Sequence, residues 1–302
     1  MGGLLAIALQ NATPVLFAML GETVSERAGV INLGLEGQML VGAATGFAVT
    51  YWTGSPALGL LAGAGAGALL SLVHVLLSQG FGANQIASGL AVLFLGSGLS
   101  AYYGTSLVDK QISGFSQGFQ HWLGHVPVLG DLLGSLTPTV YLALVLTPVV
   151  GVWMYRTRSG LKWRAVGESA EAARMMGVNP LLVRVQAIIV GGLFSGLGGA
   201  ALAVDYTQTW IENMTAGRGL LAVGLVIVAR WNPFWALPAA LLYGGSEALA
   251  LNLQSQGVQI SPYLLSLLPY VIPMLVLAGS YRAARQGRGM PRELSAVFKG
   301  ME

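Results

Sequence analysis

Residues 57–78 read ALGLLAGAGAGALLSLVHVLLS, a run without a single Asp, Glu, Lys or Arg. A helix needs roughly 20 mostly apolar residues to cross the hydrocarbon core of a bilayer, so this run predicts a membrane-spanning helix. It lies within a longer segment, Gly37 to Val108, that is also free of these charged residues. That segment is long enough for three spans, which we place at residues 37–53, 57–78 and 86–104.

Apolar stretches of similar length recur along the rest of the chain. Residues 220–229 form a shorter stretch, which we interpret as a short or broken helix. The total is about nine spans, within a range of about eight to ten. We therefore predict an all-α fold, a polytopic transmembrane helical bundle in which residues 1–302 form a single domain. The remaining predicted spans are residues 3–20, 138–155, 185–204, 220–229, 234–253 and 262–281.

The composition supports a membrane protein. Apolar residues make up 54% of the chain and charged residues only 9%, whereas an ordinary soluble domain has about 25% charged residues. Lipid accepts an apolar surface directly, so membrane lipid is an expected partner. The net charge of +3 does not indicate nucleic-acid binding, because the basic residues are clustered between apolar spans. The absence of cysteine excludes disulfides and thiolate chemistry.

Two segments hold 11 of the 15 Lys and Arg residues: the loop 156–184 and the tail 282–302. Basic residues favour the cytoplasmic side, so both segments are expected to be cytoplasmic. Four predicted spans separate them, and an even number returns the chain to the same side. Counting backwards places the N-terminus and the segment 105–137 outside.

Small residues recur every four positions in two of the predicted spans, which allows helix backbones to approach closely in lipid. We expect these stripes to pack helices within the chain, with dimerisation as the alternative. They are Gly59, Gly63 and Gly67; Gly191, Ser195 and Gly199; and Gly192, Gly196 and Ala200.

The loop 156–184 contains the signals of a short helix over residues 170–176. Ser169 is a good N-cap and Glu171 follows in the first turn. Gly177 and Pro180 end the helix. A helix this short is unstable alone in water, so we expect it to dock on a partner. The alternative is a solvated loop that only fixes topology.

This loop, AVGESAEAARMMG over residues 165–177, resembles the coupling loop of ABC importer permeases. Glu171-Ala172-Ala173 followed by Gly177 matches the start of the EAA motif. The Ile-x-Leu-Pro ending of that motif is absent, which argues against the ordinary type I permeases. The longer form resembles the branched permease family of ribose, nucleoside and branched-chain amino acid importers.

Further motifs are similar to the nucleoside and simple-sugar branch of that family, and the resemblance extends from about residue 10 to 281. One of them, SERAGVINLGLEGQ, matches a Glu-Arg-x-Gly-x-x-Asn-x-Gly-x-Glu-Gly signature. Together they are specific to the family and only suggestive of nucleosides. The motifs are residues 25–38, 82–90, 216–219 and 230–233.

The resemblance implies a type II ABC importer permease in the bacterial inner membrane. A second homologous permease, usually a different chain, would complete the pore, and this chain looks like the shorter partner. A cytoplasmic ABC ATPase would grip the coupling helix, and an extracytoplasmic solute-binding protein would deliver a solute. That solute is expected to be a nucleoside, with ribose or another simple sugar as the alternative. The residues implied in ATPase coupling are Gly167, Glu168, Glu171, Ala172, Ala173 and Gly177.

Polar residues within or beside spans are candidates for the translocation path, because polar groups inside a membrane are costly. Glu247 is the clearest, with a hydrogen-bonded structural role as its alternative. Asn32 and Glu36 precede a span among glycines, where they either support irregular backbone or contact the solute. The candidates are Asn11, Asn32, Glu36, Asn84, Gln85, Asn213, Glu247 and Asn252.

The sequence contains no lysine followed by Ser or Thr, so it lacks a Walker A motif and requires a separate ATPase subunit. We therefore expect a transport subunit that is not an enzyme and has no cofactor. His121 and His125 could share a helix face, but no third ligand lies close by, so no metal is expected. The rival function is a stand-alone secondary transporter or channel that uses Glu247 or Glu36 as an ion site. Such a protein has no evident need for a docking helix.

Overall fold

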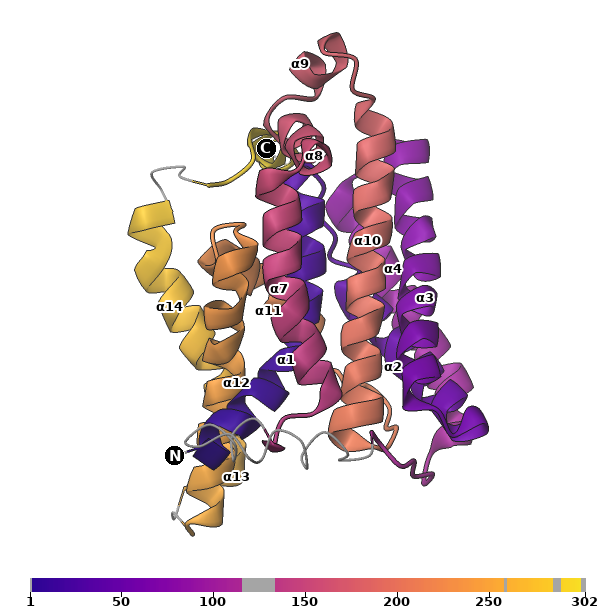
Figure 1. Ribbon diagram of the computed structural model, residues 1–302, viewed down its shortest axis with the longest axis vertical. Helices are drawn as coiled ribbons and strands as arrows, with labels where there is room; N and C mark the ends of the chain where they lie inside the picture. Colours follow the sequence, from indigo (N-terminus) through magenta and orange to yellow (C-terminus); the bar gives the residue numbers. More distant parts are fainter. Residues whose placement is uncertain (1, 116–133, 258–259, 285–288, 300–302) are drawn as a thin grey trace.

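A computed structural model of the chain describes residues 2–115, 134–257, 260–284 and 289–299 (Figure 1). These residues fold into helices and turns, with one isolated antiparallel bridge between Gln111 and Thr209. The prediction of an all-α fold is confirmed.

Each predicted span coincides with a helix. One difference is α1, which continues to Arg27 instead of ending near residue 20. The described helices are α1 (Gly2–Arg27), α2 (Leu35–Thr53), α3 (Pro56–Val75), η1 (Leu76–Gly80), α4 (Gln85–Gly104), η2 (Thr105–Leu107), α7 (Pro138–Arg156), α8 (Arg158–Glu168), α9 (Ala170–Met175), α10 (Pro180–Ala201), η3 (Leu202–Thr207), α11 (Arg218–Val228), α12 (Pro233–Ser255), α13 (Pro262–Leu265), α14 (Leu268–Ala284) and α15 (Arg292–Lys299).

Seven of the described helical segments are long and apolar enough to cross a membrane. Two of the nine predicted spans do not meet that description. The helix α2 contains Glu36 and Gln38, and α11 has only 11 residues. The count of about nine spans is therefore not confirmed. The seven segments are Gly3–Arg27, Pro56–Gly80, Gln85–Leu107, Pro138–Arg156, Pro180–Thr207, Pro233–Ser255 and Pro262–Gly279.

Local sequence explains where several helices begin. A polar residue followed by proline starts α3, α10 and α12, at Ser55-Pro56, Asn179-Pro180 and Asn232-Pro233. In each pair the polar side chain accepts a hydrogen bond from a backbone N–H group in the first turn of the helix. Proline suits the first helical position, because its missing N–H would have no partner within the helix.

The helix α10 forms the centre of the bundle, packed against α1, α2 and α3. Its small residues permit very close approach. A Cβ on Gly67 of α3 would lie 2.3 Å from the carbonyl oxygen of Gly192, and a Cβ on Gly199 would lie 1.8 Å from that of Met39. The three stripes of small residues therefore pack helices within the chain, as predicted.

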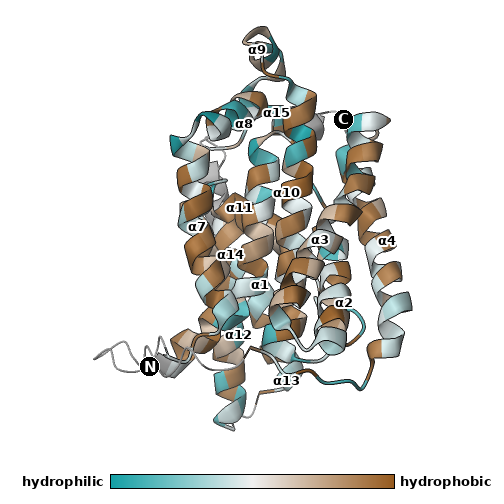
Figure 2. Ribbon diagram, turned by 45° about the vertical axis from the view of Figure 1, so that its right-hand side comes forward, coloured by the Kyte–Doolittle hydropathy of each residue, from teal (hydrophilic) through white to brown (hydrophobic). Residues whose placement is uncertain are grey.

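The helices α8, α9 and α15 lie at one end of the bundle, and the start of α1 lies at the other (Figure 1). Hydrophilic residues gather around α8 and α15, while apolar residues cover much of the length of the long helices (Figure 2). The loop 156–184 and α15 thus share one end, as the positive-inside rule requires of two cytoplasmic segments. Which end faces the cytoplasm stays a prediction.

Candidate functional site

The four sequence motifs, far apart along the chain, meet in one polar network. At the end of α1, Arg27 Nε donates to the carbonyl oxygen of Trp231 over 2.7 Å. The indole N–H of Trp231 donates to the carboxylate of Glu26. Arg230 and Trp231 have positive φ angles of 53° and 54°, a conformation that non-glycine residues adopt only with support. The first motif therefore holds the fourth in place.

The irregular segment between α1 and α2 is fixed by side chains from three helices. Glu22 Oε1 accepts the backbone N–H of Asn32 over 2.9 Å, and Gln85 Oε1 accepts that of Ile31 over 2.9 Å. The Nε2 atom of His74 lies 3.1 Å from the carbonyl oxygen of Ile31. Asn32 and His74 are fully buried. Gln85, and Asn32 through its Oδ1 atom that accepts the N–H of Gly34 over 2.9 Å, therefore support irregular backbone, and a contact of either residue with the solute stays a prediction.

Glu36 connects the first motif to the third. Its Oε1 atom accepts the Thr215 hydroxyl over 2.5 Å and the Gly217 N–H over 2.7 Å, and its Oε2 atom accepts the Gly219 N–H over 2.6 Å. Glu36 is 5% exposed. Its carboxylate binds the free amides at the start of α11, where the helix dipole favours negative charge.

The helix α11 is a half-length element. Its 11 residues span about 16 Å, against the roughly 30 Å of a bilayer core. The segment before it has positive φ angles at Gln208, Asn213, Ala216 and Gly217. Irregular backbone at membrane depth is tolerated only where it is buried or lines a cavity. The structure thus places a discontinuous element inside the bundle.

Glu247 of α12 forms an ion pair with Arg218, the first residue of α11. The Glu247 Oε1 and Arg218 Nη2 atoms are 2.8 Å apart, and the side chains are 19% and 11% exposed. The Arg218 guanidinium lies 5.6 Å from the ring centroid of Tyr243. Tyr270 of α14 donates its hydroxyl to the Ala216 carbonyl over 2.8 Å. Charged and aromatic side chains of three elements therefore form one cluster.

Sequence reasoning missed Arg218. The signal was available, because a basic residue at the start of a short apolar stretch requires an acidic partner nearby. Asp205, in η3, was missed because it lies just past the predicted span 185–204. Glu22 and Glu26 were missed because α1 was expected to end before them.

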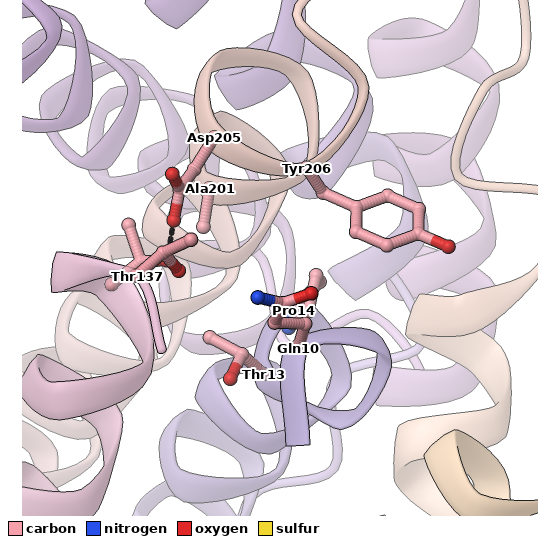
Figure 3. A pocket seen from close by; sticks show the side chains of 8 residues that line it. Gln10, Thr13, Pro14, Thr137, Ala201, Asp205 and Tyr206 are labelled. Atoms are coloured by element: carbon pink, nitrogen blue, oxygen red, sulfur yellow. Dashed lines mark hydrogen bonds between the residues drawn. The ribbon is translucent and has the colours of Figure 1, made fainter. Parts of the chain in front are cut away.

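Asp205 lines a small polar cavity together with Gln10, Thr13, Thr137 and Tyr206 (Figure 3). Thr139 donates its hydroxyl to the Asp205 carboxylate. The cavity volume of about 120 Å³ is small beside the roughly 300–1,000 Å³ of typical ligand sites. This cavity is therefore of a size for a few water molecules.

The other path candidates lie apart from this cluster or cap helices. Asn11 is 2% exposed, and its side-chain amide has no hydrogen-bond partner within the part of the chain that the structure describes. Asn84 caps α4 by accepting the N–H groups of Ile86 and Ala87. Asn213 is exposed. Asn252, near the end of α12, accepts from the side chain of Gln256 over 2.7 Å.

The predicted short helix is present as α9, with Ser169 as its N-cap and Gly177 at a φ of +78°. Met175 and Met176 at its end are 77% and 83% exposed. Ala173 is only 4% exposed and packs in the main core. The methyl group of Ala173 therefore faces the chain itself, and its implied role in ATPase coupling stays a prediction.

The remaining coupling candidates divide between surface and interior. Glu171 and Ala172 are exposed in α9. Gly167 is buried, and a Cβ there would lie 2.1 Å from the carbonyl oxygen of Arg27. Glu168 is half-exposed and lies 4.0 Å from Arg292. Gly167 therefore seats the loop against α1 and is not available to a partner.

The loop also contains a helix that the sequence analysis did not assign, α8. Its buried Trp163 and Val166 lie three residues apart, a helical spacing that could have revealed it. His121 and His125 lie outside the described residues.

Comparisons with known proteins match this chain to membrane transport subunits. Residues 4–277 match the family described as branched-chain amino acid transport system / permease component. A candidate glucose ABC transporter permease protein of Haloferax volcanii is 44% identical over 86% of this chain and 80% of its own length. The guanosine ABC transporter permease protein NupQ of Bacillus subtilis is 34% identical over 90% of this chain and 89% of its own. The nucleoside ABC transporter permease protein NupC of Lactococcus lactis is 30% identical over 88% of each chain. No solved structure matches significantly.

Proposed function

The chain belongs to the branched-chain amino acid transport system permease family and is an ABC transporter permease subunit, and from this premise we propose that it imports a nucleoside across the bacterial cytoplasmic membrane. A second permease would complete its translocation path, and an extracytoplasmic solute-binding protein would deliver the solute. A separate ABC ATPase would supply the energy. A simple sugar is the alternative solute.

The observation that carries this proposal is the exposed tip of α9. Two adjacent methionines at the end of α9 are more than three-quarters exposed, at the end of the bundle that holds the basic loop. Methionine is flexible and polarisable, which suits it to an adaptable contact. The neighbouring Glu171, Ala172 and Arg174 are also exposed. We assign this surface, Glu171 to Met176 without the buried Ala173, as the docking site of the ATPase.

The cluster of Arg218, Glu247, Tyr243 and Tyr270 supports a translocation path beside α11, α12 and α14. A partly exposed ion pair within membrane-spanning helices is costly against lipid. It is accommodated where it faces water or another protein surface. Discontinuous helices mark binding sites in several transporters, and α11 begins at this cluster. We propose that the second permease faces it and shields it from lipid.

The proposed solute class rests on the chemical groups shared by the solutes that the relatives' names give. Two of the three relatives carry the name of a guanosine or nucleoside permease, and the third that of a glucose permease. Nucleosides and sugars both have a ring with several hydroxyl groups. The carboxylate of Glu247 accepts and the guanidinium of Arg218 donates hydrogen bonds, which suits such hydroxyls. The ring of Tyr270, which joins this cluster, offers a face for stacking.

The rival function, an ion-driven secondary transporter, fits the two glutamates less well. Glu247 is paired with Arg218 over 2.8 Å, and Glu36 binds three donors at the start of α11. An ion at Glu36 would have to break these contacts, and an ion at Glu247, whose Oε2 atom has no hydrogen-bond partner among the described residues, would compete with the charge of Arg218. An ABC permease needs no such ion site.

For the topology, we propose nine crossings. They are the seven long apolar segments, α2, and the combined segment 208–228 that contains α11. An odd number places the two ends of the chain on opposite sides, and the basic residues of the tail and of the loop 156–184 then place α15 and this loop in the cytoplasm and the start of α1 outside.

The test is reconstitution in liposomes. The purified chain alone should hydrolyse no ATP. With the cognate ATPase and second permease, hydrolysis should appear and the loaded binding protein should stimulate it. ATP-dependent uptake of guanosine, competed by other nucleosides and not by glucose, would support the nucleoside proposal. Robust uptake by this chain alone, driven by an ion gradient, would overturn it in favour of the secondary transporter.

A further inference from the structure

The tail helix α15 is anchored against the bundle although it follows the last membrane helix. Leu294 is fully buried and belongs to the main hydrophobic core. Pro291, just before the helix, is also buried. Figure 2 shows α15 beside α8 and below α9. An anchored tail at this place brings its neighbouring side chains to the base of α9.

Glu293 binds two different elements with its two carboxylate oxygens. Its Oε1 atom accepts the backbone N–H of Ala170, the first residue of α9, over 2.9 Å. Its Oε2 atom accepts from Arg184 Nη2 of α10 over 2.8 Å. The two side chains are 28% and 21% exposed. One residue of the tail therefore links the start of α9 to a central membrane helix.

The helix α9 has few other attachments. Ser169 caps it by accepting the N–H of Ala172 over 3.2 Å. Ala173 is its one buried residue. The helix projects from the end of the bundle (Figure 1). Because a six-residue helix has little stability of its own, its orientation depends on these few contacts, and among the described side chains Glu293 provides the hydrogen bond that joins it to α15.

We propose that Glu293 is a positioning residue, and that the tail helix fixes the angle of α9 relative to α10. Movement applied to the tip of α9 then reaches α10 through the Ala170–Glu293–Arg184 contacts instead of bending the loop. This inference rests on the proposed function, in which α9 receives the ATPase. It assigns the tail a role in coupling beyond that of fixing topology.

The first measurement is the mobility of α9. The native chain contains no cysteine, so a nitroxide label on Met176→Cys reports on the tip alone. In the permease pair in nanodiscs, without ATPase, Glu293→Ala should give a clearly more mobile spectrum. Glu293→Gln keeps one acceptor oxygen but loses the ion pair, so an intermediate spectrum is expected. Ser295→Ala, on an exposed residue of the same helix, serves as the control and should match the parent.

The second measurement is coupling in the complete complex, with unlabelled protein. Stimulation is the ratio of ATP turnover with loaded binding protein to basal turnover. In Glu293→Ala this ratio should fall about fivefold, which is the change in an equilibrium that the loss of a typical helix cap produces. ATPase co-purification should be retained, because the tip of α9 is intact. An unchanged spectrum together with unchanged stimulation in Glu293→Ala would overturn the inference. A more mobile spectrum with normal stimulation would confirm the anchoring of α9 and overturn its proposed coupling function instead.

Discussion

Glu36 supports the start of α11, and its removal should cost stability in a graded way. The carboxylate is 5% exposed and accepts three donors, namely the Thr215 hydroxyl and the N–H groups of Gly217 and Gly219. A buried donor left without a partner costs about 1–3 kcal/mol. The hydroxyl can rotate toward another acceptor, whereas the two backbone amides cannot. We therefore expect Glu36→Ala to lower the free energy of unfolding by about 2–6 kcal/mol.

Glu36→Gln should have a smaller effect, because its amide oxygen replaces one carboxylate oxygen. That oxygen still serves Thr215 and Gly217. The amide nitrogen then faces the Gly219 N–H, donor against donor, so one bond is lost at about 1–3 kcal/mol. The assay is thermal unfolding of the purified chain in nanodiscs, followed by tryptophan fluorescence. Glu212→Gln, an exposed carboxylate shortly before α11, is the control and should stay within about 0.5 kcal/mol of the parent. Equal stability of the Ala, Gln and parent proteins would refute the role of Glu36 as the support of α11.

Three further predictions follow from packing, charge and topology. Gly67→Ala places a Cβ 2.3 Å from the Gly192 carbonyl oxygen, so it should destabilise the bundle by about 1–3 kcal/mol. Gly65→Ala is the control, because no atom lies within 4 Å of its Cβ, and it should not destabilise the bundle. Equal melting temperatures of the two variants would contradict the close packing of α3 against α10. Glu247→Gln should reduce uptake about tenfold, corresponding to roughly 1.4 kcal/mol, with assembly intact, because Arg218 loses its charged partner; uptake kinetics like those of the parent would make the ion pair purely structural. A cysteine at Thr53 should react with an impermeant reagent in intact cells, and one at Glu171 only after permeabilisation; the reverse pattern would invert the topology.

The sequence was sufficient to predict the long apolar helices but not α8 or α15, because most apolar runs have the length of a span and polar-proline pairs mark several starts. The short helix α9 was also predictable, since Ser169 and Gly177 are local signals of its two ends. Pairings between residues far apart in the sequence were not predictable. Glu26 with Trp231, Glu36 with Gly219 and Glu293 with Arg184 join residues that local patterns cannot relate.

The sequence also did not predict which single residues of a short helix are buried. Ala173 and Ala172 are chemically identical neighbours, yet one packs in the core and the other is exposed. The difference depends on how α9 lies against α8 and α10, which no pattern within the loop determines. The extension of α1 to Arg27 likewise required partners for Glu22 and Glu26 from other segments.

The substitution Met176→Glu tests whether the exposed tip of α9 receives the ATPase. Met176 is 83% exposed, so the substitution should leave folding and insertion unchanged. A charge placed in an interface hot spot costs about 2 kcal/mol or more, roughly thirtyfold in affinity. Met176→Leu keeps the apolar contact and serves as the control. The measurement is co-purification of the cognate ATPase, with ATP turnover stimulated by the loaded binding protein in liposomes. We predict that Met176→Glu loses most of both while Met176→Leu retains them. Parent levels of both in Met176→Glu would show that the ATPase does not dock on the tip of α9.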